Sequence, residues 1–441
     1  MANIISSVSL TKLFGYIDLE LTELNQIDDQ FLFLYAENGL GKTTLLNLIY
    51  SLVSSIKNEG NKSYLYSQVF EKCLVKFSSG ASICAERGGG ATEGDYELKF
   101  EFPVRNVQIK SKVKSDEAGR VNSITSPGLR EFMESVTEFL PPIIYLGADR
   151  YVRSSSREED EHNYRNYLVP NDYLMPSDWQ KSRRDNDTLQ IFKQIQIGNL
   201  ASQIRAFEAS ITQEFINSQS FGLRSSEQII QRVLRDVSAG KQNRAVINKT
   251  QAIKQLQQLK EDAIPAFQYG FDSVEPIDKT LQLIESVAEE QWQRVSAVVG
   301  TYVETNLTKY GYLIALSNRV TEFLHELSSY FLDKEITFSR REGLNIKNKI
   351  TNTEIAPAKL SSGERQLITM FALVSIRRQE PTVVLIDEPE ISLSSLWQRK
   401  LSKSFSVVSD KEQTQFLIAT HSIEILSDKA NKVVSPVIRE F

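Results

Sequence analysis

A glycine-rich segment near the amino terminus carries the residue types that hold a polyphosphate. Residues 36–43 read Ala-Glu-Asn-Gly-Leu-Gly-Lys-Thr and lie between an apolar run and a segment with helical apolar spacing. Glycines let backbone N–H groups turn toward phosphate, and the following helix points the positive end of its dipole at the anion. We expect Lys42 to reach the β and γ phosphates of ATP and Thr43 to ligate Mg²⁺. The expected nucleotide-binding residues are Asn38, Gly39, Gly41, Lys42, Thr43 and Thr44.

One position departs from the pattern G-x-x-x-x-G-K-[ST]. Ala36 occupies the place of the first glycine. Alanine is the smallest substitute for glycine, so we expect its Cβ to be tolerated at the entrance of the loop.

Two adjacent carboxylates follow an apolar strand in the segment Val-Val-Leu-Ile-Asp-Glu-Pro-Glu, residues 383–390. Asp387 would hold Mg²⁺ through its water shell, and Glu388 would orient and polarise the attacking water. An acidic loop after a buried strand is common by itself. Beside a phosphate-binding loop, the pair predicts hydrolysis of ATP with Glu388 as the catalytic carboxylate.

A second anion-binding pattern, Leu-Ser-Ser-Gly-Glu, occupies residues 360–364 and precedes a strong helical segment. Ser361 and the N–H groups of Ser362 and Gly363 would form a site at a helix amino terminus. The alternative is an ordinary serine N-cap with Glu364 as the capping glutamate. One chain does not need two such sites for one γ-phosphate. We therefore expect this signature segment to complete the ATP site of a second copy, in a homo-oligomer built from dimers.

The motifs require an α/β fold that brings distant segments together. Apolar runs before the phosphate-binding loop, the Asp-Glu pair and His421 predict strands of a mixed or parallel sheet flanked by helices. Residues 3–21 predict a strand pair around Gly15, and residues 64–105 predict an antiparallel meander. Strand character returns with a hairpin around Glu342 and Gly343.

A helical insertion separates the two halves of this α/β fold. Residues 190–330 show helical apolar spacing without a long unbroken heptad pattern, which predicts a short coiled coil, hairpin or bundle. Gly240, Pro265, Gly270 and Pro276 interrupt the pattern. The expected division is an amino-terminal lobe at 1–150, a charged loop and helical insertion at 151–335, and a carboxy-terminal lobe at 336–441.

Composition limits the classes of function. The 441 residues carry a formal net charge of −5, whereas proteins that coat nucleic acid are usually basic, so a DNA contact would need a local patch. The only cysteines, Cys73 and Cys84, are expected to be reduced thiols. No apolar run approaches the roughly 18 residues of a membrane helix, and the start lacks the pattern of a signal peptide. These features predict a cytoplasmic protein without a membrane contact.

The order of these motifs, with Ile-Ser-Leu-Ser-Ser at 391–395 and Thr-His-Ser at 420–422, resembles the ABC-type ATPases of the SMC, repair and OLD group. The resemblance implies an ABC-type ATPase head that binds ATP and Mg²⁺. It implies that His421 is the switch histidine, which contacts the γ-phosphate. It also implies that Ser392, Leu393 and Ser394 form the D-loop, which crosses the dimer interface.

Two further sites of the family lack a clear counterpart. The Q-loop would follow the strand that begins at Ile143, where Asp149 and Arg150 stand instead of a glutamine. Phe14 or Tyr16 would stack on adenine, although an aromatic residue on a strand is more often part of the core.

Within this group, the length of the insertion and the motif layout resemble the ATPase subunit of the PARIS anti-phage system, with the Septu ATPase as the close competitor. The resemblance implies a separate effector chain, a TOPRIM-type toxin nuclease in PARIS, and a phage-encoded trigger. No TOPRIM domain or HNH cluster is recognisable in this sequence.

Several functions compete on these residues. The first is a sensor ATPase that controls an effector nuclease. The second is an SMC-like or repair ATPase acting directly on DNA ends or recombination intermediates, with the charged stretch at Arg183 and Arg184 and the helices after it as the contact. A transporter motor fits poorly because of the long insertion, and a scaffold that hydrolyses ATP very slowly is a fourth interpretation.

Overall fold

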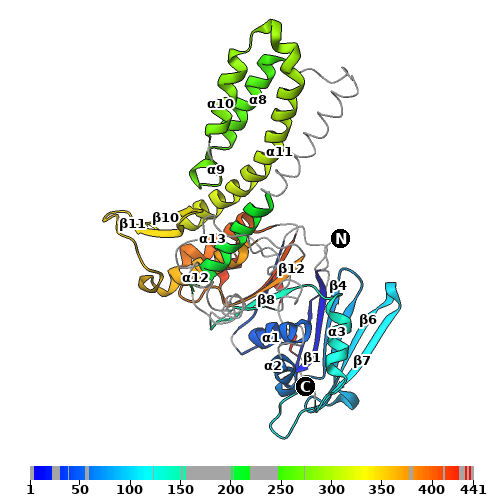
Figure 1. Ribbon diagram of the computed structural model, residues 1–441. Helices are drawn as coiled ribbons and strands as arrows, with labels where there is room; N and C mark the ends of the chain where they lie inside the picture. Colours follow the sequence, from blue (N-terminus) through cyan, green and yellow to red (C-terminus); the bar gives the residue numbers. More distant parts are fainter. Residues whose placement is uncertain are drawn as a thin grey trace.

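In the computed structural model, the described part of the chain forms two large β-sheets flanked by helices, a two-stranded hairpin and a helical arm (Figure 1). The structure describes residues 4–21, 30–37, 39–54, 59–122, 124–149, 152–154, 200–201, 203–218, 247–272, 274–376, 381–410, 413–426, 433–434 and 437–438. Outside these residues lie most of the predicted charged loop after Ser154 and the individually predicted Asn38, Arg150, Arg183, Arg184 and Gly240. Within the described ranges, no helix is both long and apolar enough to cross a membrane.

A six-stranded sheet forms the centre of the head, in the order β14-β3-β13-β12-β8-β9. Neighbouring strands are parallel except for β9 at the edge. Strands β12 and β13 are buried along their whole length, which explains why both read as continuous apolar runs. The strands span Phe31–Tyr35 (β3), Ile143–Leu146 (β8), Val152–Ser154 (β9), Thr382–Asp387 (β12), Thr414–Thr420 (β13) and Val433–Val434 (β14).

A second, antiparallel sheet has the order β15-β2-β1-β4-β5-β6-β7. It confirms the predicted strand pair around Gly15 and the predicted meander, which continues through one more strand than expected. Burial alternates along β6 because one face packs on the core and the other meets solvent. The strands span Ile5–Leu13 (β1), Ile17–Leu21 (β2), Lys72–Phe77 (β4), Ser82–Glu86 (β5), Tyr96–Phe102 (β6), Val107–Val113 (β7) and Val437–Ile438 (β15).

Helix α1 (Lys42–Val53) lies between the two sheets. Leu32 and Leu34 of β3 join it in a core that includes the antiparallel sheet. Phe31 and Phe33 face the opposite way, into a core shared with the carboxy-terminal helices and the arm. This alternation along one strand fixes the layers of the head, because a shift of one residue would exchange the two cores.

Helix α2 packs on α1 and α3 packs on the antiparallel sheet, whereas the remaining helices lie on the other side of the central sheet or build the arm (Figure 1). Their bounds are Glu59–Ser67 (α2), Leu129–Thr137 (α3), Lys249–Asp262 (α8), Ile264–Gln268 (α9), Glu275–Ser286 (α10), Glu289–Ser328 (α11), Ser362–Ser375 (α12), Ser395–Val408 (α13) and Ile423–Leu426 (α14). A further helix, without a label in Figure 1, occupies residues 203–218.

The predicted helical insertion is an arm in which α8, α10 and α11 pack together. Pro265 and Pro276 stand in the first turns of α9 and α10, and Gly270 follows α9 with φ of 74°. The apolar pattern that runs through residues 281–307 is broken by extended backbone at Val287 and Ala288. Beyond that break, α11 runs unbroken for 40 residues into the head.

The foot of the arm is bonded to both ends of α12. Arg319 of α11 donates to the carbonyl of Ser375 at 3.0 Å, at the carboxyl end of α12. Lys334, the first residue of β10 (Lys334–Ser339), forms an ion pair with Glu364 in the first turn of α12 at 2.8 Å. Polar contacts therefore connect the arm to the helix that begins with the signature segment.

The hairpin of β10 and β11 (Gly343–Asn348) is held against the helix at 203–218. The Glu208 carboxylate accepts a hydrogen bond from the N–H of Leu344 at 2.7 Å. Gly343 has φ of 77°, and a Cβ there would overlap the Glu208 carboxylate. Glycine is required at this turn both by its backbone conformation and by the close approach of Glu208.

Gly343→Ala should lower the free energy of unfolding by about 2 kcal/mol, because strained backbone is added to the loss of the hydrogen bond to the half-buried Glu208 carboxylate. Gly270→Ala is the matched control: its φ of 74° is nearly the same, but a Cβ there meets nothing within 4 Å. It should cost only about 1 kcal/mol. Urea titrations of the two variants measure the difference, and equal losses would show that Glu208 does not matter here.

Candidate functional site

Three predicted motifs meet at the carboxyl ends of adjacent parallel strands. Thr420 of β13 pairs with Tyr35 of β3, and Ala419 of β13 pairs with Asp387 of β12. The N–H of Glu388 donates to the carbonyl of Ala419 at 2.8 Å. The predicted phosphate-binding loop, the predicted catalytic carboxylate Glu388 and His421 therefore leave the sheet at the same edge, where open α/β sheets bind their ligands.

The phosphate-binding loop has the backbone that its glycines allow. Gly39 and Gly41 have φ of 87° and 78°, and Gly41 is the N-cap of α1. Ala36 is absent from the positive-φ residues of the described chain, so its position does not demand glycine. This explains why the departure from the pattern is tolerated. Asn38, also predicted to bind nucleotide, lies outside the described residues.

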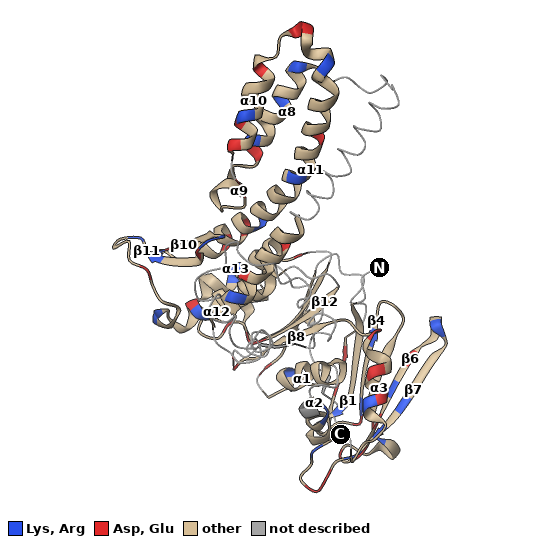
Figure 2. Ribbon diagram, in the orientation of Figure 1, with Lys and Arg blue, Asp and Glu red and all other residues tan. Residues whose placement is uncertain are grey.

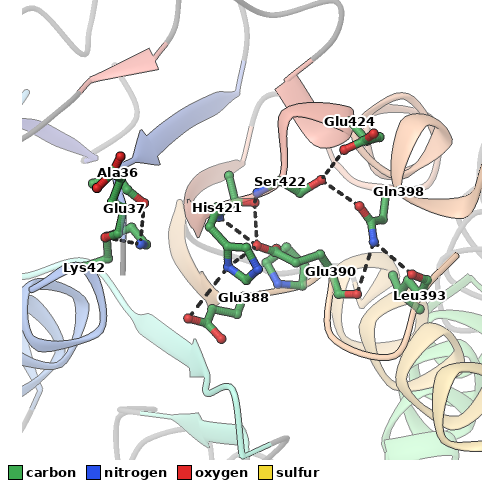
Figure 3. A network of polar contacts seen from close by, with 12 residues as sticks. Ala36, Glu37, Lys42, Glu388, Glu390, Leu393, Gln398, His421, Ser422 and Glu424 are labelled. Carbon is green, nitrogen blue, oxygen red and sulfur yellow. Dashed lines mark hydrogen bonds and ion pairs between the residues drawn. The ribbon is translucent and has the colours of Figure 1, made fainter. Parts of the chain in front are cut away.

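Lys42 is buried and bonded to its own loop. Its ammonium donates to the carbonyls of Ala36 at 2.6 Å and Glu37 at 3.0 Å (Figure 3). These contacts hold the charge at the centre of the loop, where a phosphate would replace carbonyl partners. Thr43 is exposed and Thr44 is half-buried, so both hydroxyls can face a ligand.

The turn between β1 and β2 brings aromatic residues to the phosphate-binding loop. Phe14 and Tyr16 are 38% and 39% exposed, so the interpretation that they belong to the core is wrong. A Cβ at Gly41 would come within 3.2 Å of the Phe14 ring. Phe14 is thus a partly exposed aromatic residue beside the loop, which is compatible with the prediction that it stacks on adenine.

Asp387 is 2% exposed and lies beside Thr43. Its Oδ2 accepts from the Tyr145 hydroxyl at 3.2 Å, whereas Oδ1 has no hydrogen-bond partner in the described structure. Burial raises the pKa of Asp387 to about 6, against the opposing effect of hydrogen bonds from Thr43 and Tyr145. A buried carboxylate oxygen without a partner, next to a threonine hydroxyl, fits the oxygen ligands that Mg²⁺ prefers.

Glu388 and His421 lie together beyond the strand ends. Glu388 has φ of 48°, an uncommon backbone for a glutamate, which directs the turn after β12. Its Oε1 is 4.0 Å from Nδ1 of His421, and the His421 side chain is 44% exposed. The structure therefore brings together the two residues predicted to be catalytic.

Glu390 is a residue of this site that was not predicted from the sequence. This buried carboxylate accepts from the Thr420 hydroxyl and from the backbone N–H of His421, and it lies 3.0 Å from Nδ1 of His421 (Figure 3). The sequence does offer a signal for this role, because Glu390 is a third acid, two positions after Glu388, in the segment that follows a fully buried strand.

The signature segment begins α12 with an exposed amino terminus. Ser361 Oγ accepts from the N–H of Glu364, and the Glu364 carboxylate accepts from the N–H of Ser361 at 2.8 Å. This capping box is the local arrangement that the alternative interpretation predicted. Ser361 and Ser362 are nevertheless exposed, so the helix terminus is open to a ligand or a partner chain. No hydrogen bond in the described residues joins either serine to Lys42 or Asp387.

Gly363 packs directly against the predicted D-loop. A Cβ at Gly363 would overlap the carbonyl oxygen of Ser392, and the Trp397 ring lies beside it at 3.4 Å. Ser392 itself has φ of 64°, Leu393 is buried, and Ser394 is the N-cap of α13. The signature segment and the predicted D-loop therefore pack directly against each other.

A family model described as "AAA domain, putative AbiEii toxin, Type IV TA system" matches residues 315–427. The chain is 28% identical over 101 residues to a putative ABC transporter ATP-binding protein of Clostridium acetobutylicum, covering 23% of this chain and 35% of that protein. It is 29% identical over 133 residues to the lipoprotein-releasing system ATP-binding protein LolD of Francisella tularensis, covering 28% of this chain and 55% of LolD. The chain thus spans about a third to a half of these relatives.

Solved SMC heads are also similar over the whole chain at low scores. The Smc head domain with an extended coiled coil from Pyrococcus furiosus gives a TM-score of 0.38 at 10% identity, covering 99% of this chain and 94% of that one. The SMC head domain from Thermotoga maritima gives 0.31 at 11% identity, with 99% of both chains covered. The sheet brings the predicted motifs together, and the sequence matches are to ATP-binding proteins of transport systems.

Asp387→Asn should make the protein more stable at pH 7.5 without Mg²⁺. The raised pKa means that ionising this carboxyl opposes folding, so stability falls as pH rises from 3.8 to about 6. A pKa shift of that size predicts a gain of about 3 kcal/mol in the free energy of unfolding, measured with urea.

Asp333→Asn provides a control of opposite sign, because a hydrogen bond from Lys334 lowers the pKa of Asp333. That substitution should not stabilise the protein. A loss of stability in Asp387→Asn would contradict the interpretation that the ionised Asp387 carboxylate is destabilised by burial and is placed to ligate Mg²⁺.

Proposed function

We propose that the chain binds Mg-ATP at the edge of the central sheet and hydrolyses it between two copies of itself. The observation that carries the proposal is the meeting of Lys42, Thr43, Asp387, Glu388 and His421 at one sheet edge. The same chain presents a second helix terminus, at Ser361 and Ser362, that remains open.

Each residue has a role that its position supports. Lys42 neutralises the β and γ phosphates, and Thr43 and Asp387 hold Mg²⁺, which offsets charge on the transferred phosphoryl group. Glu388 orients the attacking water, and His421 contacts the γ-phosphate. The partner copy supplies Ser361 and the N–H groups of Ser362 and Gly363 to the same phosphate.

The contact between Gly363 and Ser392 would couple the two ATP sites of the proposed dimer. The D-loop follows Glu388 by a few residues in the same chain, whereas the signature segment serves the ATP of the other chain. Because the two segments touch, a movement at one ATP site displaces the surface that completes the other.

At a finer level, we propose a cytoplasmic sensor ATPase of an anti-phage system that controls a separate effector. The description of the matching family as a putative AbiEii toxin of a toxin–antitoxin system supports this direction. A TOPRIM-type nuclease in a PARIS-like system is the proposed effector, a phage-encoded protein is the proposed trigger, and a Septu-like system is the competitor.

Direct action on DNA is less well supported. Lys and Arg are interspersed with Asp and Glu along the arm and the antiparallel sheet (Figure 2). On the sheet, Glu86 pairs with both Lys72 and Lys99. Mixed charge of this kind weakens the attraction for a phosphate backbone.

A mixture of two inactive variants tests the composite site. Lys42→Ala and Ser361→Arg should each lower ATP turnover at least about 100-fold, since each removes one half of every site. Mixed in equal amounts, they should recover about a quarter of wild-type turnover, because half of the dimers contain one intact site. The control Glu304→Arg, on the exposed side of α11, should stay active. A mixture that stays inactive argues against sites shared between chains.

Phage protection tests the finer proposal. Cells carrying this gene with its neighbour should lose protection with Lys42→Ala and with Glu388→Gln, because both variants stop the ATP cycle. Plaque counts measure the effect. Unaltered protection in both variants would rule out an ATP-driven sensor, and a TOPRIM or HNH neighbour would distinguish the PARIS-like from the Septu-like proposal.

A further inference from the structure

Glu390 lies behind His421, in the turn that follows β12 (Figure 3). Its side chain is 5% exposed, and a carboxylate that is so buried needs hydrogen-bond donors around it. The donors found in the described structure are Thr420, the last residue of β13, and His421, which follows it.

The contacts converge on one oxygen, Oε1. The Thr420 hydroxyl donates to it at 2.9 Å and the backbone N–H of His421 at 2.7 Å, while Nδ1 of His421 lies 3.0 Å away. A carboxylate only accepts hydrogen bonds, so Nδ1 must carry a proton to bond with it. With Nδ1 committed to Glu390, Nε2 is the nitrogen left for the phosphate.

We propose that Glu390 is a positioning residue that holds His421 in one rotamer and, without nucleotide, in one tautomer, with Nδ1 protonated and donated to Glu390. Nε2 then faces the γ-phosphate, and it must carry a proton when it bonds there, because phosphate oxygens only accept hydrogen bonds. The proposal deepens the proposed function and rests on it for its kinetic part. Glu390 acts through His421 and does not itself touch the nucleotide.

Two features give His421 a need for such a partner. Its side chain is 44% exposed, and an exposed imidazole that lacks a partner samples several rotamers. Glu388 is a competing acceptor, but it stands 4.0 Å from Nδ1, against 3.0 Å for Glu390. Because Glu390 is nearer, the imidazole bonds to Glu390 and not to Glu388, and the Glu388 carboxylate stays available to the attacking water.

Glu390 is itself fixed from the other side. The Gln398 side chain of α13 donates to the carbonyls of Leu393 at 2.8 Å and Glu390 at 3.4 Å. Its carbonyl end accepts from the Ser422 hydroxyl at 2.6 Å. The segment that carries His421 is therefore tied through Glu390 and Gln398 to the D-loop, so the orientation of His421 depends on the surface that meets the partner copy.

The test compares Glu390→Leu with Glu390→Gln. Leucine fills the space without an acceptor, whereas glutamine retains one oxygen, and all three contacts use a single oxygen. Nitrogen-15 NMR of labelled histidine reports the tautomer directly. The chain has only three histidines, so a His421→Ala spectrum assigns the signal. Steady-state ATP hydrolysis gives kcat and KM for the same variants.

We expect the Nδ1-protonated tautomer in the wild type and in Glu390→Gln, and its loss in Glu390→Leu. Glu390→Leu should lower kcat about tenfold or more with KM for ATP within about threefold, since ATP binding at Lys42 is untouched. Glu390→Gln should restore most of kcat. Thr420→Val, which removes a donor to Glu390 without altering the imidazole contact, should keep the tautomer.

Three results would overturn the proposal: a wild-type His421 whose Nδ1 carries no proton, an unchanged tautomer and kcat in Glu390→Leu, or a Glu390→Gln variant as impaired as Glu390→Leu. If Glu390→Leu fails to fold, the wild-type tautomer and the Glu390→Gln kinetics still decide. A wild type without ATP turnover would contradict the proposed function alone, because the NMR measurement judges Glu390 independently.

Discussion

The parallel pairing of β3, β13 and β12 is the constraint on which the rest of the head depends. Each strand ends in a segment with a chemical task, and the register places the three ends in one row. The strands are fully or largely buried, and their alternate side chains serve two different cores, one around α1 and one around α12 and α13. A slip of one residue would therefore break both cores and separate the catalytic groups at the same time.

The site is also a place where the chain departs from what is locally most stable. Glu388 and Ser392 have positive φ, Asp387 is a buried carboxylate with an unpaired oxygen, and Gly363 leaves no room between the signature segment and the D-loop. Departures of this kind persist where the surrounding structure enforces them and where a ligand or a partner compensates for them. Mg²⁺ would compensate for the charge of Asp387, and the phosphates of ATP would take up the ammonium of Lys42.

The arm is connected to the head through α12. Arg319 and Lys334 bond to opposite ends of the helix that begins with the signature segment. This connection through a 40-residue helix would offer a physical route between a partner bound along the arm and the proposed composite ATP site.

Much of this arrangement could be predicted from the sequence, because it rests on local patterns. Gly39, Gly41 and Lys42 stand between a strand and a helix, and two acids follow an apolar strand, a combination specific to phosphate-binding loops and their metal sites. Glu390 could not be assigned from its position alone, because its role depends on the pairing of β12 with β13. Phe14 and Tyr16 were harder for the same reason: strand position favours burial, and only the fold shows that their turn opens beside Gly41.

The central claim is that ATP joins two copies through the signature segment. Sedimentation velocity of Glu388→Gln, which should bind ATP without hydrolysing it, measures this most directly. Mg-ATP should convert a slower-sedimenting species into a dimer or an assembly of dimers. Adding Ser361→Arg to the same chain should abolish this increase in the sedimentation coefficient. A Glu388→Gln protein that binds Mg-ATP with no change in sedimentation would contradict the claim.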